Sequence, residues 1–245
     1  MDTIVSLTTL PSRINNIHHI VRTILSQTFL PDEIVLYLPE RCNRTNELYV
    51  IPEELIELEK TNWKFNIRRV QKDMGPGTKW YYAMKEGYKK IISFDDDVLI
   101  HQQSIEELLK SHKKFPTEAL GFMGTIDGKF VHSEHLTNIE KYPVSLLGGY
   151  RSVLFPWGNF TYEMKQKFID AFETLCEEKP VVDDDYFLSK AWKHFGVTCS
   201  VIPTLFHWKF FFLDWGNVDG VNHETNTENM EQDRKRIDQF FSYYI

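Results

Sequence analysis

The stretch of residues 90–97, KIISFDDD, constrains the fold more than any other part of the chain. Its first half contains Ile91, Ile92 and Phe94, and β-branched and aromatic residues favour a covered β-strand. Three consecutive carboxylates follow at once, and like charges repel one another, so they need water or a cation. The strand must therefore leave the sheet near residue 95. Because ligands of open α/β sheets bind at the carboxyl ends of the strands, we expect a ligand site there.

Elsewhere the chain alternates short apolar runs with segments of helical periodicity. Such alternation predicts an α/β fold, a single domain whose mostly parallel central sheet is flanked by helices. Residues 130–147 follow neither pattern and are expected to be irregular. The expected strands are residues 4–7, 33–38, 66–70, 91–94, 120–125 and 197–202, and the expected helices are residues 14–25, 52–60, 79–89, 104 onward, 161–176, 184–194 and 228–241.

Charge and cysteine content narrow the functional classes. The formal net charge is −7, which argues against nucleic acid as the main partner. Three cysteines, Cys42, Cys176 and Cys199, lack metal-type spacing and predict reduced structural thiols, and hence a cytoplasmic protein. The first residues lack the basic and apolar regions of a signal peptide, and no apolar run reaches the length of a membrane span. We therefore expect no transmembrane segment.

Four segments, taken in their order along the chain, resemble the GT-A-fold glycosyltransferases that use nucleotide sugars, as found in capsule and viral glycan loci. The segments are residues 4–13, residues 27–38, the FDDD of residues 94–97, and Gly148-Gly149 together with the aspartates of residues 183–185. The resemblance implies one GT-A-like, that is Rossmann-like, domain over residues 1–245. Its nucleotide-binding half would be residues 1–100, its acceptor and catalytic half residues 101–206, and its C-terminal flap and helix residues 207–245.

By this resemblance, the aspartates after the 91–94 strand form a DXD motif, the metal and nucleotide site. A divalent cation, Mn²⁺ or Mg²⁺, would stabilise the charge of the diphosphate leaving group. The resemblance implies Asp97 as the direct metal ligand, with Asp95 assisting the metal or the sugar and Asp96 close to the nucleotide. A third, C-terminal ligand would be His207, with His223 as its rival. The plain alternative for the triplet is a solvated acidic turn.

The resemblance also indicates where the donor nucleotide sugar binds. Thr8, Thr9 and Arg13 follow the first strand, which in this fold opens toward the base and ribose. Lys79 follows a glycine-containing turn, residues 75–78, so we expect it to reach a phosphate or the base. For Arg13 and Lys79 the alternative is a solvated surface charge. The expected donor-binding set is Thr8, Thr9, Arg13, Asp73, Lys79, Asp95, Asp96 and Gly149.

A glycine pair, Gly148-Gly149, resembles the segment that forms the floor under the donor sugar and the acceptor. Glycine permits close approach of a sugar ring. Two aromatic residues downstream, Trp157 and Phe160, either stack on the sugar or simply complete the core.

A second acidic triplet stands directly before an expected helix. A helix dipole favours acids at this place, but three in a row exceed what capping requires. The resemblance implies that this position supplies the catalytic carboxylate, which in an inverting enzyme takes the proton of the acceptor hydroxyl. The register stays open among Asp183, Asp184 and Asp185, with Asp184 preferred and Asp183 next. Inversion and retention are both left open.

Together these features predict a metal-dependent hexosyl- or pentosyltransferase. It would move a sugar from an NDP-sugar, by preference a UDP-sugar, to a hydroxyl of a glycan or oligosaccharide acceptor. One alternative is a nucleotidyltransferase, but the loop of residues 8–13 lacks the glycines expected after its first strand. The other is a catalytically inactive sugar- or nucleotide-binding module, which need not keep both acidic triplets. The aromatic residues between 207 and 227 predict a flap over the bound donor.

Overall fold

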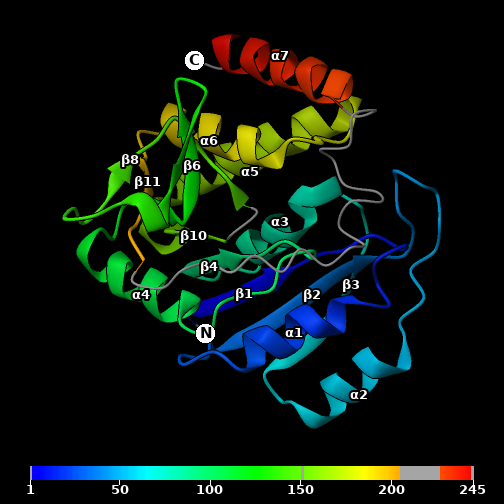
Figure 1. Cartoon of the computed structure of the whole chain (residues 1–245). Coiled ribbons are helices and arrows are strands. Elements are labelled where there is room, and N and C mark those ends of the chain that lie inside the picture. The colour runs from blue at the N-terminus through cyan, green and yellow to red at the C-terminus, as the bar shows by residue number, and fades with distance from the viewer. Residues whose placement is uncertain (1, 150–151, 205–226, 244–245) are drawn as a thin grey trace.

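A central sheet organises the computed structural model in Figure 1, which describes residues 2–149, 152–204 and 227–243. Within these residues the sheet has eight strands. In spatial order they are β3 (Phe65–Val70), β2 (Glu33–Pro39), β1 (Thr3–Leu7), β4 (Lys90–Ser93), β10 (Val153–Phe155), β5 (Ala119–Gly121), β11 (Cys199–Val201) and β8 (Tyr142–Pro143).

Most neighbours in this sheet run parallel. The strands β3, β2, β1 and β4 form a continuous parallel block. Only β10, which is antiparallel to both β4 and β5, and β8, which is antiparallel to β11, reverse the direction within the described sheet. The predicted α/β fold with a mostly parallel sheet is confirmed.

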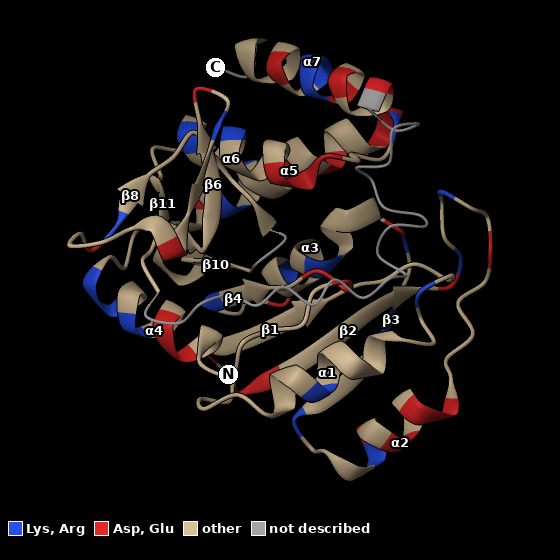
Figure 2. Cartoon of the chain, viewed as in Figure 1, with Lys and Arg blue, Asp and Glu red and all other residues tan. Residues whose placement is uncertain are grey.

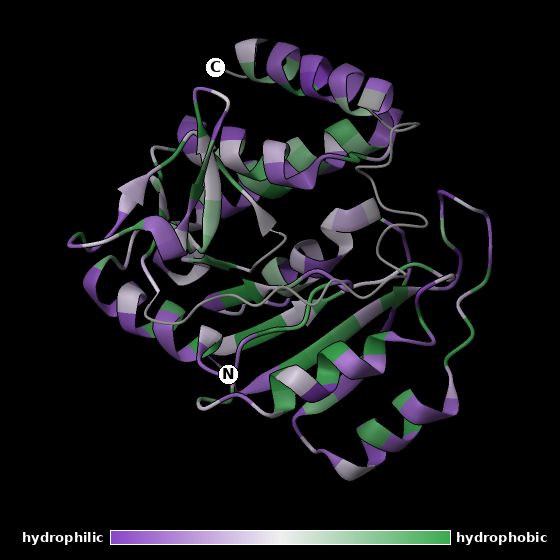
Figure 3. Ribbon diagram, in the orientation of Figure 1, coloured by the Kyte–Doolittle hydropathy of each residue, from purple (hydrophilic) through white to green (hydrophobic). Residues whose placement is uncertain are grey.

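Alternate residues of each strand bury their side chains on opposite faces of the sheet. On β1, for example, Ile4 packs with one hydrophobic cluster and Val5 with the other, and both are fully buried. Figure 3 shows β1 and β2 as hydrophobic strands between the helices. The cluster that contains Val5 is covered by α1 (Ile17–Leu25), α2 (Glu53–Thr61) and α4 (Ser104–Lys114). The cluster that contains Ile4 is covered by α3 (Thr78–Lys85), α5 (Tyr162–Glu178) and α6 (Asp184–His194), and α7 (Thr227–Tyr243) packs on α6.

Aromatic rings fill the core beneath α3 and α6. The indole of Trp80 stacks parallel to the ring of Phe187, with 5.8 Å between the ring centroids. Trp157 is 1% exposed and Phe160 is 8% exposed, and the Trp157 Nε1–H donates to the carbonyl of Met84 at 3.0 Å. These two rings therefore pack in the core, the second of the two readings that their sequence position allowed.

The structure differs from the expected elements mainly between residues 120 and 147. The expected 120–125 strand is two strands in different sheets, β5 and β6 (Met123–Ile126). The segment expected to be irregular contains β7 (Lys129–His132), β8 and β9 (Leu146–Leu147), and β6 lies between β7 and β9 in a small second sheet. Strands of two to four residues are too short to show a period of two, so the sequence pattern missed them.

Three short 3₁₀ helices complete the described elements, η1 (Gly75–Gly77), η2 (Ser133–His135) and η4 (Trp157–Asn159). Cys42, Cys176 and Cys199 are buried free thiols, which agrees with the expected structural role. No helix in the described ranges is both long and apolar enough to cross a membrane. The flap predicted for residues 207–227 lies outside the described residues, except for Thr227, which begins α7.

Candidate active site

The candidate site begins where two neighbouring parallel strands end. Register pairing places Ser6 of β1 opposite Ser93 of β4, so the segments that follow them leave the sheet side by side. The loop of residues 8–13 therefore lies beside the aspartates of residues 95–97. The hydroxyl of Ser6 also donates to the carbonyl of Lys79, which ties the first turn of α3 to the same edge.

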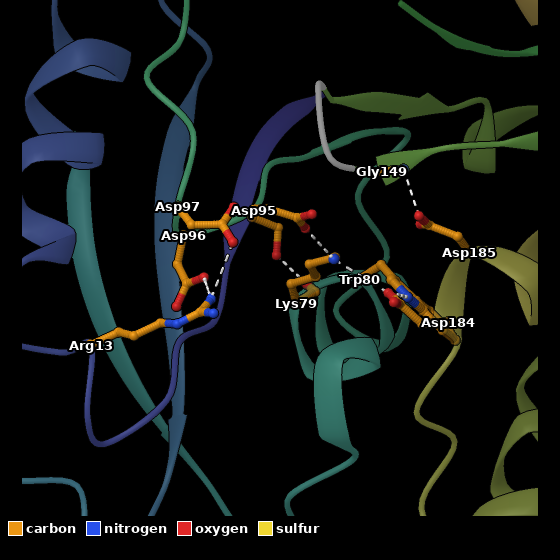
Figure 4. Close-up of polar contacts among 10 residues, drawn as sticks. Arg13, Lys79, Trp80, Asp95, Asp96, Asp97, Gly149, Asp184 and Asp185 are labelled. Carbon is orange, nitrogen blue, oxygen red and sulfur yellow. Dashed lines mark hydrogen bonds and ion pairs between the residues drawn. The ribbon is translucent and has the colours of Figure 1, made fainter. Parts of the chain in front are cut away.

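Asp96 shapes the loop between these strand ends. It is 7% exposed, and its carboxylate accepts a hydrogen bond of 2.6 Å from the Thr9 hydroxyl and one of 2.7 Å from Arg13 Nη1 (Figure 4). The Arg13 side chain is itself buried and also lies 3.3 Å from Asp97 Oδ2. Burying these charges is tolerated because they are paired. Thr9, Arg13 and Asp96 thus hold the acidic loop in shape.

Asp95 and Asp97 are the more accessible members of the triplet, with side-chain exposures of 29% and 24%. Burial, followed by the charges of Asp95 and Asp96, raises the pKa of Asp97 to about 7. This repulsion between hard oxygen donors would be relieved by a divalent cation. Mg²⁺ is commonly held by one or two carboxylates together with substrate phosphates, so Asp95 and Asp97 fit such an ion.

The described residues hold no group of three or more histidine, cysteine or acidic side chains arranged as a complete metal site. His207 and His223, the expected third ligand and its rival, lie outside the described residues.

Lys79 joins the two acidic triplets. Its ammonium lies 2.7 Å from Asp95 Oδ1 and 3.3 Å from Asp184 Oδ2, and the residue is 5% exposed (Figure 4). Burial lowers the pKa of Lys79, but the carboxylates of Asp184 and Asp95 raise it more, so that it lies well above its ordinary value. The expected phosphate-reaching lysine is therefore a protonated bridge between carboxylates. Nothing in the sequence near residue 79 indicates its pairing with residue 184.

The three aspartates before and within α6 have three different environments. Asp183 is the N-cap of α6: its carboxylate accepts the Tyr186 amide at 3.1 Å and pairs with Arg234 at 2.6 Å. Asp184 is buried and accepts a hydrogen bond of 3.0 Å from the Trp80 indole, in addition to its contact with Lys79. Only the fold distinguishes these roles, because all three residues carry the same side chain.

Asp185 is partly exposed and faces Gly149 (Figure 4). The Gly149 amide donates to its carboxylate at 2.8 Å. A Cβ at position 149 would lie 2.6 Å from Asp185 Oδ1, so any other residue there would require the Asp185 carboxylate to move. Burial, followed by the charge of Asp184, raises the pKa of Asp185 well above its ordinary value. Gly149 thus meets an acid of the second triplet in this structure.

The two remaining expected donor-binding residues engage the protein itself. The Asp73 carboxylate accepts the backbone amides of Asn43 at 2.7 Å and of Gly75 at 2.8 Å. Gly75 has a φ of +66°, so this contact stabilises the tight turn that leads into α3. Thr8 donates from its hydroxyl to the carbonyl of Tyr37 at 3.0 Å, which links the ends of β1 and β2.

Comparison with solved structures shows a shared fold. The structure of S. aureus TarS, a glycosyltransferase, superimposes with a TM-score of 0.55 at 13% sequence identity, over 99% of this chain and 44% of TarS. TarS 1-349 in complex with UDP gives a TM-score of 0.54 at 15% identity, over 99% of this chain and 72% of that one. A further crystal structure of S. aureus TarS 1-349 gives a TM-score of 0.53 at 12% identity, with the same coverage.

The likeness is one of fold. No protein-family profile matches the chain, and no curated protein sequence matches it. This chain spans less than half of the TarS structure with the highest of these three scores. The fold is thus that of a known glycosyltransferase, with a Rossmann-like sheet, as the sequence resemblance led us to expect.

Proposed function

We propose that the chain is a glycosyltransferase that transfers a sugar from a UDP-sugar to a hydroxyl of a glycan acceptor. The observation that carries this proposal is the pair of acidic clusters, Asp95 with Asp97 and Asp184 with Asp185, which lie on either side of Lys79. One cluster suits a cation and a diphosphate, and the other suits proton transfer. The shared fold with TarS, which has been captured with UDP, supports UDP as the nucleotide.

On the donor side, Asp95 and Asp97 would hold Mn²⁺ or Mg²⁺, which when bound would stabilise negative charge on the leaving diphosphate. Arg13, Thr9 and Asp96 keep that carboxylate pair at the ends of β1 and β4. Lys79 places a positive charge at the same point, because its ammonium is held in the site by two carboxylates. Arg13 and Lys79 offset most of the charge of the three aspartates, so a bound divalent cation would make this group of residues net positive toward a nucleoside diphosphate.

On the acceptor side, we assign the general base to Asp185, one position later than the sequence preference for Asp184. The pKa of both acids is raised by burial, which suits a proton acceptor, but Asp184 is buried between Lys79 and Trp80, whereas Asp185 is partly exposed and can be reached by an acceptor. The acceptor oxygen would bond to the anomeric carbon as the bond from that carbon to the diphosphate oxygen breaks. The hydroxyl proton would pass to Asp185, and this single displacement inverts the anomeric centre.

A donor panel tests the proposed activity against the two alternatives. The full chain is incubated with Mn²⁺ and individual NDP-sugars, and the released nucleotide is measured. We expect slow release of UDP from at least one UDP-sugar, because a glycosyltransferase without its acceptor slowly transfers the sugar to water. Release of pyrophosphate from a nucleoside triphosphate with a sugar phosphate would instead indicate a nucleotidyltransferase. Tight UDP binding with no turnover of any donor would indicate a binding module.

A first prediction concerns the metal ligands. We expect Asp97→Ala to remove the effect of Mn²⁺ on UDP affinity, measured by titration calorimetry with and without the ion. The fold should persist, because the substitution relieves repulsion among three carboxylates and opens no apolar cavity. Asp170→Ala, an exposed acid of α5, is the control and should keep the full Mn²⁺ effect. An unaltered Mn²⁺ effect in Asp97→Ala would remove this residue from the cation site.

A further inference from the structure

The C-terminal helix α7 packs on the start of α6, the helix that bears the second acidic cluster (Figure 1). Charged residues of both signs occur along α7 in Figure 2. One of them, Asp233, is 5% exposed, and Ile237 one turn later is fully buried. A buried carboxylate is costly unless it is paired and hydrogen-bonded, so the contacts of Asp233 are informative.

Asp233 holds the backbone that enters α6. Its Oδ2 accepts the amide of Val182 at 2.9 Å and the amide of Asp183 at 3.1 Å. Its Oδ1 pairs with Arg236 Nη2 at 2.6 Å, and Arg236 also donates to the carbonyls of Leu175 and Lys179 at 2.6 and 2.8 Å. One buried carboxylate thus fixes the start of α6 to α7 and, through Arg236, to the end of α5.

Arg234, the next residue of α7, holds the side chain of the α6 N-cap. Its Nε lies 2.6 Å from Asp183 Oδ2, while Asp183 Oδ1 accepts the Tyr186 amide. Asp184 and Asp185 lie between these two anchored points. Asp233 therefore holds the backbone before these two acids, and the Asp183 cap, whose carboxylate is also paired with Arg234, holds the backbone after them at Tyr186.

We propose that Asp233 and Arg234 are positioning residues, which fix the positions of the Asp184 and Asp185 carboxylates relative to Lys79 and Gly149. The inference rests on the proposed glycosyltransferase function. It adds that the positions of the two acceptor-side acids depend on contacts with α7. A displacement of about 1 Å at a reacting group lowers a rate by about 100-fold, so holding the backbone on both sides of these acids has a direct effect on turnover.

The test compares Arg234→Ala and Asp233→Asn with Asp238→Asn. Asp238 also lies on α7 and contacts α6, but through the ends of the Tyr186 and Lys190 side chains and not through the backbone amides or the N-cap carboxylate at the entry of the helix. We expect the first two variants to lower kcat for sugar transfer by about 10- to 100-fold, with the KM for the donor and the affinity for UDP unchanged. Asp238→Asn should keep both constants. Arg234→Lys, which keeps the charge, should recover part of the rate.

Amide hydrogen exchange of residues 182–186 gives a second readout that needs no turnover. We expect faster exchange in Arg234→Ala than in the wild type, with no change in Asp238→Asn. Unchanged exchange, or faster exchange with a normal kcat, would overturn the inference.

If the wild type transfers no sugar although exchange behaves as expected, the proposed function fails and the anchoring by α7 stands. Should Asp233→Asn not fold, Arg234, whose side chain is 43% exposed, still provides the test.

Discussion

Asp185→Asn is expected to lower sugar transfer by about 10²- to 10⁴-fold while UDP affinity stays unchanged. Asparagine keeps the shape of the side chain, and its Oδ1 can still accept the Gly149 amide, which lies 2.8 Å from the native carboxylate. It cannot take a proton from an acceptor hydroxyl near neutral pH. Initial rates with saturating donor and acceptor, together with calorimetry of UDP binding, separate the two effects.

The pH profile checks for a base of raised pKa, and because the pKa of Asp184 is raised as well, the two Asp→Asn variants decide which residue it is. Because burial and then the charge of Asp184 raise the pKa of Asp185, the base loses its proton-accepting form at a higher pH than an ordinary aspartate. The kcat/KM of the wild type should therefore fall on acidification well above the usual carboxyl range. If Asp184→Asn is inactive and Asp185→Asn is nearly normal, the base is the buried neighbour, as the sequence alone suggested.

Lys79→Met is expected to lower the free energy of unfolding by about 3–5 kcal/mol. Methionine matches the length of the lysine stem but removes the charge that lies 2.7 Å from Asp95 and 3.3 Å from Asp184. Asp184 would then be buried without its cation, and that uncompensated charge dominates the cost. Urea unfolding at pH 7 measures the change.

The same helix supplies a control for this prediction. Lys85 on α3 has a side-chain exposure of 49% and pairs with Glu173 at 2.9 Å, so Lys85→Met should cost only about 0–1 kcal/mol. Adding Asp184→Asn to Lys79→Met should recover part of the lost stability, because it removes the unpaired charge. A cost for Lys79→Met as small as that for Lys85→Met would show that the bridge contributes little to stability.

The local sequence pattern was sufficient to predict most of the strands and helices and the placement of the acidic residues at their ends. A short run of β-branched and aromatic residues that ends in three carboxylates favours a strand end, so the position of residues 95–97 beyond the carboxyl end of β4 could be predicted from the sequence. The same holds for the acids at the start of α6, because helix onset and acidic residues are both visible in the chain. The alternation of strands and helices was likewise enough to predict the parallel sheet.

The roles within the two acidic clusters required the tertiary structure. Asp183, Asp184 and Asp185 are chemically identical, and each acquires its environment from a partner remote in the chain. Trp80 lies 104 residues from Asp184, Arg234 lies 51 residues from Asp183, and Gly149 lies 36 residues from Asp185. Such pairings depend on which elements the fold brings together. Local pattern thus predicts acidic residues at the end of β4 and at the start of α6, whereas long-range packing sets which acid caps a helix, which pairs with Lys79 and which remains partly exposed.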